Sequence, residues 1–121
     1  MINREEIFQY IKEKYNVKPE YLFLKSPDCA VFRNKTNNKW FGIMMHIEKR
    51  KIGINEDGSI DIINLKGDPE LNSILRSQQH IMAAYHMNKK HWISVLLNYD
   101  FPVNELFEMI DWSYQLSTKK K

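Results

Sequence analysis

The densest group of side chains that could do chemistry lies in residues 84–92, whose sequence is AYHMNKKHW. Within this short segment the chain places a phenol, two imidazoles, an amide, two amines and an indole: Tyr85, His86, Asn88, Lys89, Lys90, His91 and Trp92. Such a set could bind a metal ion, supply a catalytic base, contact nucleic acid, or form the turn of a β-hairpin. Each possibility makes a different demand on the rest of the chain.

A metal site is the first possibility, because imidazole is a common zinc ligand and His80 lies nearby. His86 and His91 are five positions apart across an expected turn, which is no established ligand spacing. No acidic residue lies between Tyr85 and Leu97, and a single cysteine excludes a multi-cysteine metal site or an internal disulfide. The sequence therefore predicts no metal and no cofactor.

Catalysis is the second possibility. Cys29 could be activated by His46, His86 or His91, but PDCAVF places it at the start of an expected strand, where a lone cysteine usually packs as a small apolar side chain. The carboxylates of the last expected helix fit an exposed outer face: Glu105, Glu108 and Asp111. The four glycines stand alone and form no phosphate-binding loop. We expect no catalytic residues and a protein that is not an enzyme.

Binding is the third possibility, because cations cluster where turns are expected. They are Lys35 and Lys39, Lys49, Arg50 and Lys51, and Lys89 and Lys90, with Trp40, Tyr85 and Trp92 beside them. Basic loops beside a sheet can contact a phosphate backbone. Lysines are also common at hairpin tips, where they keep strand edges from aggregating. Nucleic-acid binding and an interaction domain for another ligand therefore both remain open.

The composition fits one compact domain. The chain has 121 residues, of which 43% are hydrophobic, enough to form a core. Its net charge of +3 equals the contribution of a C-terminal lysine run, Lys119–Lys121, so the folded body is nearly neutral and permits phosphate contact without demanding it. The first residues form an amphipathic helical pattern, and no apolar stretch is long enough to span a membrane. We expect a cytoplasmic protein without membrane contact, with a monomer favoured.

Turn and cap signals predict the order of the elements. Asn3 and Asp68-Pro69 mark helix starts, Pro102 opens the last helix, and residues 29–34 and 39–47 form a hairpin. A third strand follows at residues 59–66, and two more flank the turn NKKH, at 81–87 and 92–97. The apolar stripes of the last two helices are expected to be Leu71, Ile74 and Leu75, and then Leu106, Phe107 and Ile110 with Tyr114 or Ser113. The order α-β(3)-α-β(2)-α predicts an α+β domain of two layers, an antiparallel sheet packed against helices.

Four segments occur in a fixed order that resembles the MmcQ/YjbR family of small bacterial proteins: AVFRNKTNNKWFGIMM, DIINLKGDPEL, AYHMNKKHWISVLL and LFEMIDWSYQL. The similarity covers residues 21–116. It implies a YjbR-like fold of the order given above, shared in outline with CyaY-like and secretion-chaperone domains. It also implies double-stranded DNA binding through a double-wing arrangement of basic loops. Gly67 departs from the family pattern, since members often carry cysteine there, and any role of a thiol at this position is absent.

The resulting hypothesis is a single YjbR-like domain at residues 1–116, followed by a disordered lysine tail at 117–121. In the DNA-binding interpretation, phosphates are contacted by Lys35, Lys39, Lys49, Arg50, Lys51, Lys89 and Lys90, which should then lie on one face. In the alternative, a protein or small ligand binds a concave pocket lined by Tyr85, His86, Asn88, His91 and Trp92. We further expect Asn88 to take the left-handed turn position and Tyr85 to be a cross-strand neighbour of Trp92.

Overall fold

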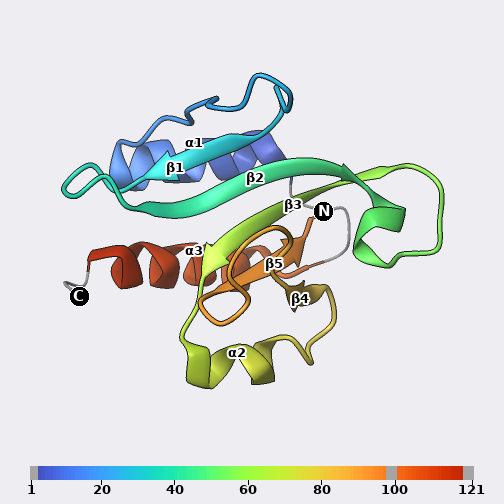
Figure 1. The fold of residues 1–121 in the computed structure, drawn as a ribbon. Coiled ribbons are helices and arrows are strands. Elements are labelled where there is room, and N and C mark those ends of the chain that lie inside the picture. The colour runs from blue at the N-terminus through green and yellow to red at the C-terminus, as the bar shows by residue number, and fades with distance from the viewer. Residues whose placement is uncertain (1–2, 98–100, 119–121) are drawn as a thin grey trace.

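The computed structural model describes residues 3–97 and 101–118 and has the predicted α+β architecture (Figure 1). In chain order its elements are α1 (Arg4–Tyr15), β1 (Ala30–Arg33), β2 (Trp40–Glu48), the 3-10 helix η1 (Lys49–Ile52), β3 (Ser59–Lys66), α2 (Pro69–Leu75), β4 (Ile81–Ala83), β5 (Trp92–Leu96) and α3 (Val103–Thr118). The strands form one antiparallel sheet of order β1-β2-β3-β5-β4. None of the helices in the described ranges is long and apolar enough to cross a membrane.

Two helix starts follow the predicted capping chemistry. The Asn3 side chain accepts a hydrogen bond from the Glu6 amide at 2.9 Å, and the Glu6 carboxylate accepts one from the Asn3 amide, which completes a capping box. Asp68 caps α2 through a 2.8 Å bond from the Glu70 amide, with Pro69 in the first turn. At the other end of the chain, Ser117 and Thr118 belong to α3, so the prediction of a disordered tail at 117–121 is wrong for these two residues; residues 119–121 lie outside the described ranges.

The sheet has two apolar faces. Helices α1 and α3 cover one of them, and the main core between helices and sheet contains Ile7, Ile11, Phe32, Phe41, Met44, Ile63, Leu65, Leu106 and Ile110. Alternate residues of the same strands point to the opposite face, called the outer face below, which carries Val31, Ile43, Ile60, Ile62 and Leu96. No α-helix in the described ranges is part of the clusters on this face, where Met87 and Tyr85 of the β4–β5 loop and Ile52 and Ile54 of the β2–β3 connection, which includes η1, pack.

A serine of α3 joins β2 and β3 at the end where their ladder stops. The last paired residues of this ladder are Gly42 and Leu65, so Phe41 and Lys66 would come next. The Ser113 hydroxyl instead accepts a hydrogen bond from the Lys66 amide at 2.7 Å and donates one to the Phe41 carbonyl. Ser113 is fully buried. Its hydroxyl thus satisfies two backbone groups that the sheet leaves open, and Ser113, not Tyr114, is the buried member of the predicted pair.

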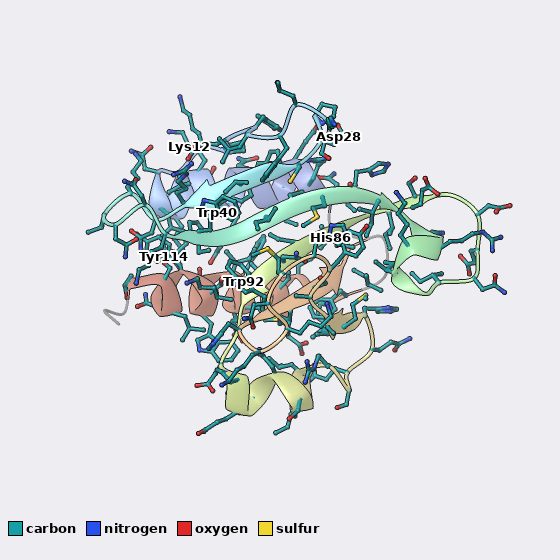
Figure 2. All side chains as sticks on the ribbon, viewed as in Figure 1. Lys12, Asp28, Trp40, His86, Trp92 and Tyr114 are labelled. Carbon is teal, nitrogen blue, oxygen red and sulfur yellow. The ribbon has the colours of Figure 1, made fainter. Side chains whose placement is uncertain are left out.

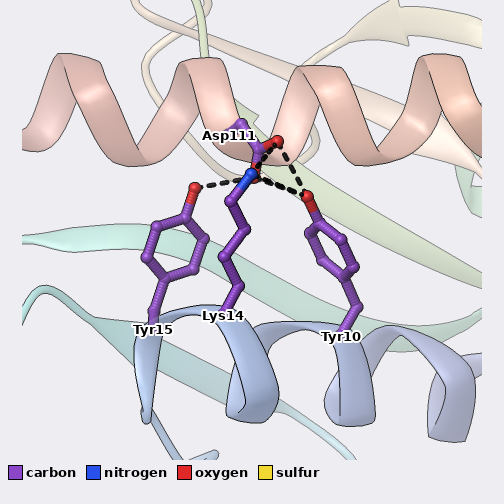
Figure 3. Close-up of polar contacts among 4 residues, drawn as sticks. All are labelled: Tyr10, Lys14, Tyr15 and Asp111. Carbon is purple, nitrogen blue, oxygen red and sulfur yellow. Dashed lines mark hydrogen bonds and ion pairs between the residues drawn. The ribbon is translucent and has the colours of Figure 1, made fainter.

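Asp111 links the two long helices, although the sequence placed it on an exposed face (Figure 3). Its carboxylate accepts hydrogen bonds from the hydroxyls of Tyr10 at 2.7 Å and Tyr15 at 2.6 Å, and forms an ion pair with Lys14 at 2.7 Å. Burial raises the pKa of both tyrosines, and the bonds to Asp111 raise them further. Burial alone would raise the pKa of Asp111, but hydrogen bonds from Lys14, Tyr15 and Tyr10 outweigh it and hold that pKa below its usual range.

Replacing this carboxylate should weaken the helical layer. We expect Asp111→Ala to lower the free energy of unfolding at neutral pH by about 2 kcal/mol, because two partly buried hydroxyls lose a charged acceptor. The folded-state pKa of Asp111 is lowered, so its contribution is present above the unfolded-state value of about 4 and is lost as the pH falls through the folded-state value. Urea unfolding of both proteins should therefore show a difference that shrinks in acid. Glu108→Ala, an exposed change on the same helix, should have little effect at any pH.

The predicted apolar stripe of α2 is wrong in two of its three residues. Leu75 packs against the main core, but Leu71 and Ile74 are 45% and 60% exposed. The buried residue of this seven-residue helix is Asn72, whose amide donates to the Lys90 carbonyl at 2.8 Å. A Cβ at position 67 would lie 2.1 Å from the Asn72 side-chain oxygen, so Gly67 leaves the space that Asn72 fills.

Candidate nucleic-acid interface and the loop of residues 84–91

Residues 84–91 form a loop of eight residues between β4 and β5, and not a tight hairpin turn. The predicted strand at residues 81–87 ends at Ala83 because side chains take over the backbone groups of Tyr85. The Tyr85 amide donates to the Ser94 hydroxyl at 2.9 Å, and the Tyr85 carbonyl accepts from the Asn64 amide at 2.9 Å. The Ser94 hydroxyl in turn donates to the Asn64 side-chain oxygen, and both side chains are fully buried. This network holds the start of the loop on the outer face.

Asn88 has a structural role that differs from the predicted one. The left-handed residue of the loop is His86, with φ of 58°, so the expectation for Asn88 is wrong. The Asn88 side chain accepts hydrogen bonds from the amides of Lys90 at 2.8 Å and His91 at 3.3 Å, and its carbonyl accepts one from Trp92. Asn88 therefore closes the second half of the loop and is occupied by the loop's own backbone.

Trp92 and Tyr85 are not cross-strand neighbours, which corrects a second expectation. Trp92 begins β5 opposite Lys66 of β3, and the Lys66 ammonium lies 5.7 Å from the centre of the indole ring. Tyr85 lies beyond the end of β4 and stacks on His86, with ring centres 4.0 Å apart and an angle of 11° between the planes. Trp92 is only 8% exposed, so its ring supports Lys66 and offers no free face to a ligand.

The five residues of the alternative hypothesis do not converge on one pocket. Tyr85 and His86 line a cavity of about 480 Å³, but Asn88, His91 and Trp92 are not among its lining residues. Across the residues that the structure describes, no group of three or more histidine, cysteine or acidic side chains is placed to hold a metal ion. Cys29 packs beside Val31 on the outer face, and burial raises the pKa of its thiol.

The structure separates the seven predicted cations into groups. Lys35 and Lys39 lie in the hairpin before β2, whereas Lys49, Arg50 and Lys51 follow its last residue (Figure 1). A nine-residue strand spans about 30 Å, so these groups lie at opposite ends of the molecule's longest strand. Within the second group, Lys49 pairs with Glu56 at 3.2 Å and Arg50 pairs with Asp57 at 2.9 Å, so neighbouring carboxylates offset its charge.

The remaining predicted cations join two that the sequence analysis missed. Lys66 lies on the outer face, its pKa lowered by burial and by the nearby charge of Lys39. Arg76, at the end of α2, donates to the Lys89 carbonyl at 3.3 Å. Alternate residues of a strand point to the same face, so the sequence SIDIINLK could have placed Lys66 on the face of Ile60 and Ile62. No sequence pattern indicated that Arg76 would lie near these cations. We use the name basic surface for the cations of four segments: Lys35 and Lys39 of the β1–β2 hairpin, Lys66 at the end of β3, Arg76 at the end of α2, and Lys89 and Lys90 of the β4–β5 loop.

The two loops that carry most of the basic surface are held firmly. In the β1–β2 hairpin, the Asn34 side chain donates to the Ser117 hydroxyl at 3.0 Å and the Asn37 side chain donates to the Ser117 carbonyl at 2.8 Å, which ties the hairpin to the last turn of α3. In the β4–β5 loop, the Lys89 ammonium donates to the Ala84 carbonyl at 2.9 Å. Both loops therefore present their charges from defined backbones.

Comparisons with known proteins agree with this fold. The family model YjbR matches residues 4–116. The chain is 41% identical to the uncharacterized protein YyaQ of Bacillus subtilis, over 97% of this chain and 99% of that protein. It is 32% identical to the uncharacterized protein YjbR of Escherichia coli K12 over an alignment covering 65% of this chain and 69% of that protein.

Solved structures show the same arrangement. A crystal structure of a Pseudomonas syringae protein, 46% identical, superposes with a TM-score of 0.93 over 96% of this chain and 99% of that one. A Deinococcus radiodurans protein, 28% identical, superposes with a TM-score of 0.71 over 96% of this chain and 78% of that one. Together with the family match and the predicted order of elements, these similarities establish that the chain belongs to the YjbR family.

Proposed function

We propose that this protein binds double-stranded nucleic acid without catalysing a reaction, and that the basic surface contacts the phosphates. The observation that carries the proposal is the place of Lys66 at the end of β3: the charge of Lys39 is near enough to lower its pKa, and the next residue, Gly67, donates to the His91 carbonyl of the loop that carries Lys89 and Lys90. Within residues 3–97 and 101–118, no carboxylate forms an ion pair with Lys66. A phosphate bridging these ammonium groups would relieve their mutual repulsion.

The aromatic residues of this surface favour a duplex over a single strand. Single-stranded nucleic acid is usually bound by stacking its bases on exposed aromatic rings. Trp92 is almost fully buried beneath Lys66, and the half-buried Trp40 makes an edge contact with Phe23 at 6.3 Å between ring centres. Beside Lys66 the surface therefore offers charged groups and a covered indole, which suits contact with a phosphate backbone.

Fluorescence anisotropy with a labelled duplex tests this function. We expect binding at 50 mM salt that weakens at least tenfold at about 200 mM, because each phosphate contact releases counterions. Lys89→Glu/Lys90→Glu should weaken binding at low salt by about tenfold or more, since two phosphate contacts become repulsive. A single strand of the same length should bind less tightly than the duplex.

The matched control is a pair of charge reversals at the other end of β2. Lys49→Glu/Lys51→Glu changes the net charge by the same amount but lies outside the basic surface. A change in net charge also acts at long range, and salt screens that effect. Once it is allowed for, the duplex affinity of this variant should stay within about twofold of the wild type. Equal losses in the two variants would show that only net charge matters, and no binding at low salt would end the proposal.

A further inference from the structure

A cavity on the outer face lies apart from the basic surface. Its volume is about 480 Å³, within the usual range for small-molecule sites. Its lining comes from the loop before β1, the last residues of β2, η1, the first residue of β3 and the β4–β5 loop. In Figure 2, Asp28 and His86 lie toward the end of the sheet where η1 is found, whereas Trp40 lies toward the other end.

The floor of the cavity is apolar and its wall is aromatic. Met45 and Ile47 of β2 form the floor with Cys29, whose thiol is kept neutral because burial raises its pKa. The stacked rings of Tyr85 and His86 form the wall. His86 adopts a left-handed backbone conformation that side chains other than glycine seldom take, and such conformations persist only when their surroundings impose them.

The wall is preorganised from below. The buried Asn64 and Ser94 side chains hold the Tyr85 amide and carbonyl, which fixes the backbone that presents both rings. His86 is exposed, so its ring offers a face to an incoming molecule. A ligand ring that stacks there loses little free energy to ordering the site, because the site is ordered before binding.

The rim combines cations with carboxylates. Lys25 and Lys51 line the cavity and form no ion pair with any residue of the described ranges. Asp28 and Glu48 line it as well, and His46 is bound to Asp61 at 2.9 Å. The ammonium group of either lysine can bind one anionic group of a ligand. The carboxylates of Asp28 and Glu48 would repel a second anionic group, and they can accept hydrogen bonds from donors on the ligand's ring.

We propose that this cavity binds a small planar aromatic molecule that carries one anionic group and a hydrogen-bond donor on its ring. The ring stacks on His86 over the floor of Met45 and Ile47, and the anionic group lies against Lys51 or Lys25. The site does not depend on nucleic-acid binding, because its lining residues and the basic surface have no member in common.

Amide chemical shifts of the ¹⁵N-labelled protein test the site. The probes are AMP and 4-hydroxybenzoate, each a ring with an anionic group and a donor, with adenosine and inorganic phosphate as the separate parts. We expect AMP or 4-hydroxybenzoate to shift the amides of Ser26, Met45, Tyr85 and His86 saturably, and the probe that does so distinguishes a phosphate from a carboxylate ligand. Adenosine and phosphate alone should bind more weakly than AMP.

Two variants with matched controls locate the site. His86→Asn removes the ring but keeps a residue that tolerates the left-handed conformation, and it should weaken binding about tenfold. Lys51→Gln should weaken it about fivefold. His91→Asn and Lys90→Gln, the same changes outside the cavity, should have no effect.

Three results would overturn the proposal. The first is that neither AMP nor 4-hydroxybenzoate shifts these amides at concentrations up to about 10 mM. In the second, inorganic phosphate shifts them as strongly as AMP, so that the ring plays no part. The third is that His91→Asn weakens binding as much as His86→Asn does.

Discussion

Asn64→Ala is expected to lower the free energy of unfolding by about 3 kcal/mol, because it strands buried polar groups on both sides of the removed amide. The Tyr85 carbonyl loses its donor and the Ser94 hydroxyl loses its acceptor, while a small cavity opens in the outer face. The same change should release the β4–β5 loop, since Asn64 and Ser94 are what hold its first residues against the sheet. Urea unfolding measures the stability, and hydrogen exchange at the Tyr85 and His86 amides measures the loop.

An exposed asparagine provides the control for this substitution. Asn104 lies in the first turn of α3 with its side chain in solvent, so Asn104→Ala should change stability by less than about 0.5 kcal/mol. Asn64→Asp tests the hydrogen bond itself. A carboxylate cannot donate to the Tyr85 carbonyl but a protonated carboxyl can, so its penalty should shrink as the pH falls. A penalty that is the same in acid and at neutral pH would show that the donated bond is not what Asn64 contributes.

Ser113→Ala is the second change with a large expected effect, a loss of about 2 kcal/mol in the free energy of unfolding. The Phe41 carbonyl, which is buried, and the Lys66 amide, which is partly buried, then lose their shared partner between β2 and β3. Alanine favours helices slightly more than serine does, so the measured loss is what remains after that gain. Calorimetric or urea unfolding measures the difference.

Ser73→Ala corrects for the helix propensity. Ser73 is an exposed serine of α2, so the same substitution there should be neutral or slightly stabilising. Ser113→Cys should give an intermediate loss, because a thiol is a weaker hydrogen-bonding group than a hydroxyl. If Ser113→Ala proved as mild as Ser73→Ala, the two strands would have to pair without help from α3.

The sequence predicted the elements whose causes are local. Asn3 and Asp68 cap the helices they were expected to cap, and the hairpin of β1 and β2 forms with a bulge between Phe32 and Arg33. These features depend on residues within a few positions of one another, where capping and turn chemistry operate. The α+β order followed from them and is confirmed.

The errors arose where tertiary contacts override local pattern. Leu71 and Ile74 have helical spacing, yet α2 turns Asn72 inward because the side of the helix facing the protein meets the polar β4–β5 loop and not the sheet. The predicted strand at 81–87 is cut short by Asn64 and Ser94, which lie on other strands and cannot be paired with Tyr85 from spacing alone. Asp111 looked solvated because its partners, Tyr10, Lys14 and Tyr15, are about one hundred residues away in the chain.

The candidate site was predicted in part. The lysines of the hairpin and the loops were recognised from the sequence. The ion pairs that offset the charges of Lys49 and Arg50 were not, because their acidic partners follow η1 in the chain. The position of this group at the far end of β2 could be known only from the pairing of the strands. Lys66 was within reach of strand alternation, since it continues the face of Ile60 and Ile62. The cavity beside His86 could not be predicted, because its lining comes from five segments that are far apart in the sequence and form no linear motif.

The Ser113 contact also bears on the order in which the domain can mature during synthesis. Ser113 lies on α3, the last element of the domain to leave the ribosome, whereas the backbone groups it satisfies belong to β2 and β3. A nascent chain that has emerged only through β5 therefore has two open backbone polar groups between β2 and β3, and an apolar face that α1 covers without α3. Chains stalled before α3 should be cleaved by protease at β2 and β3, and chains stalled after α3 has emerged should resist it.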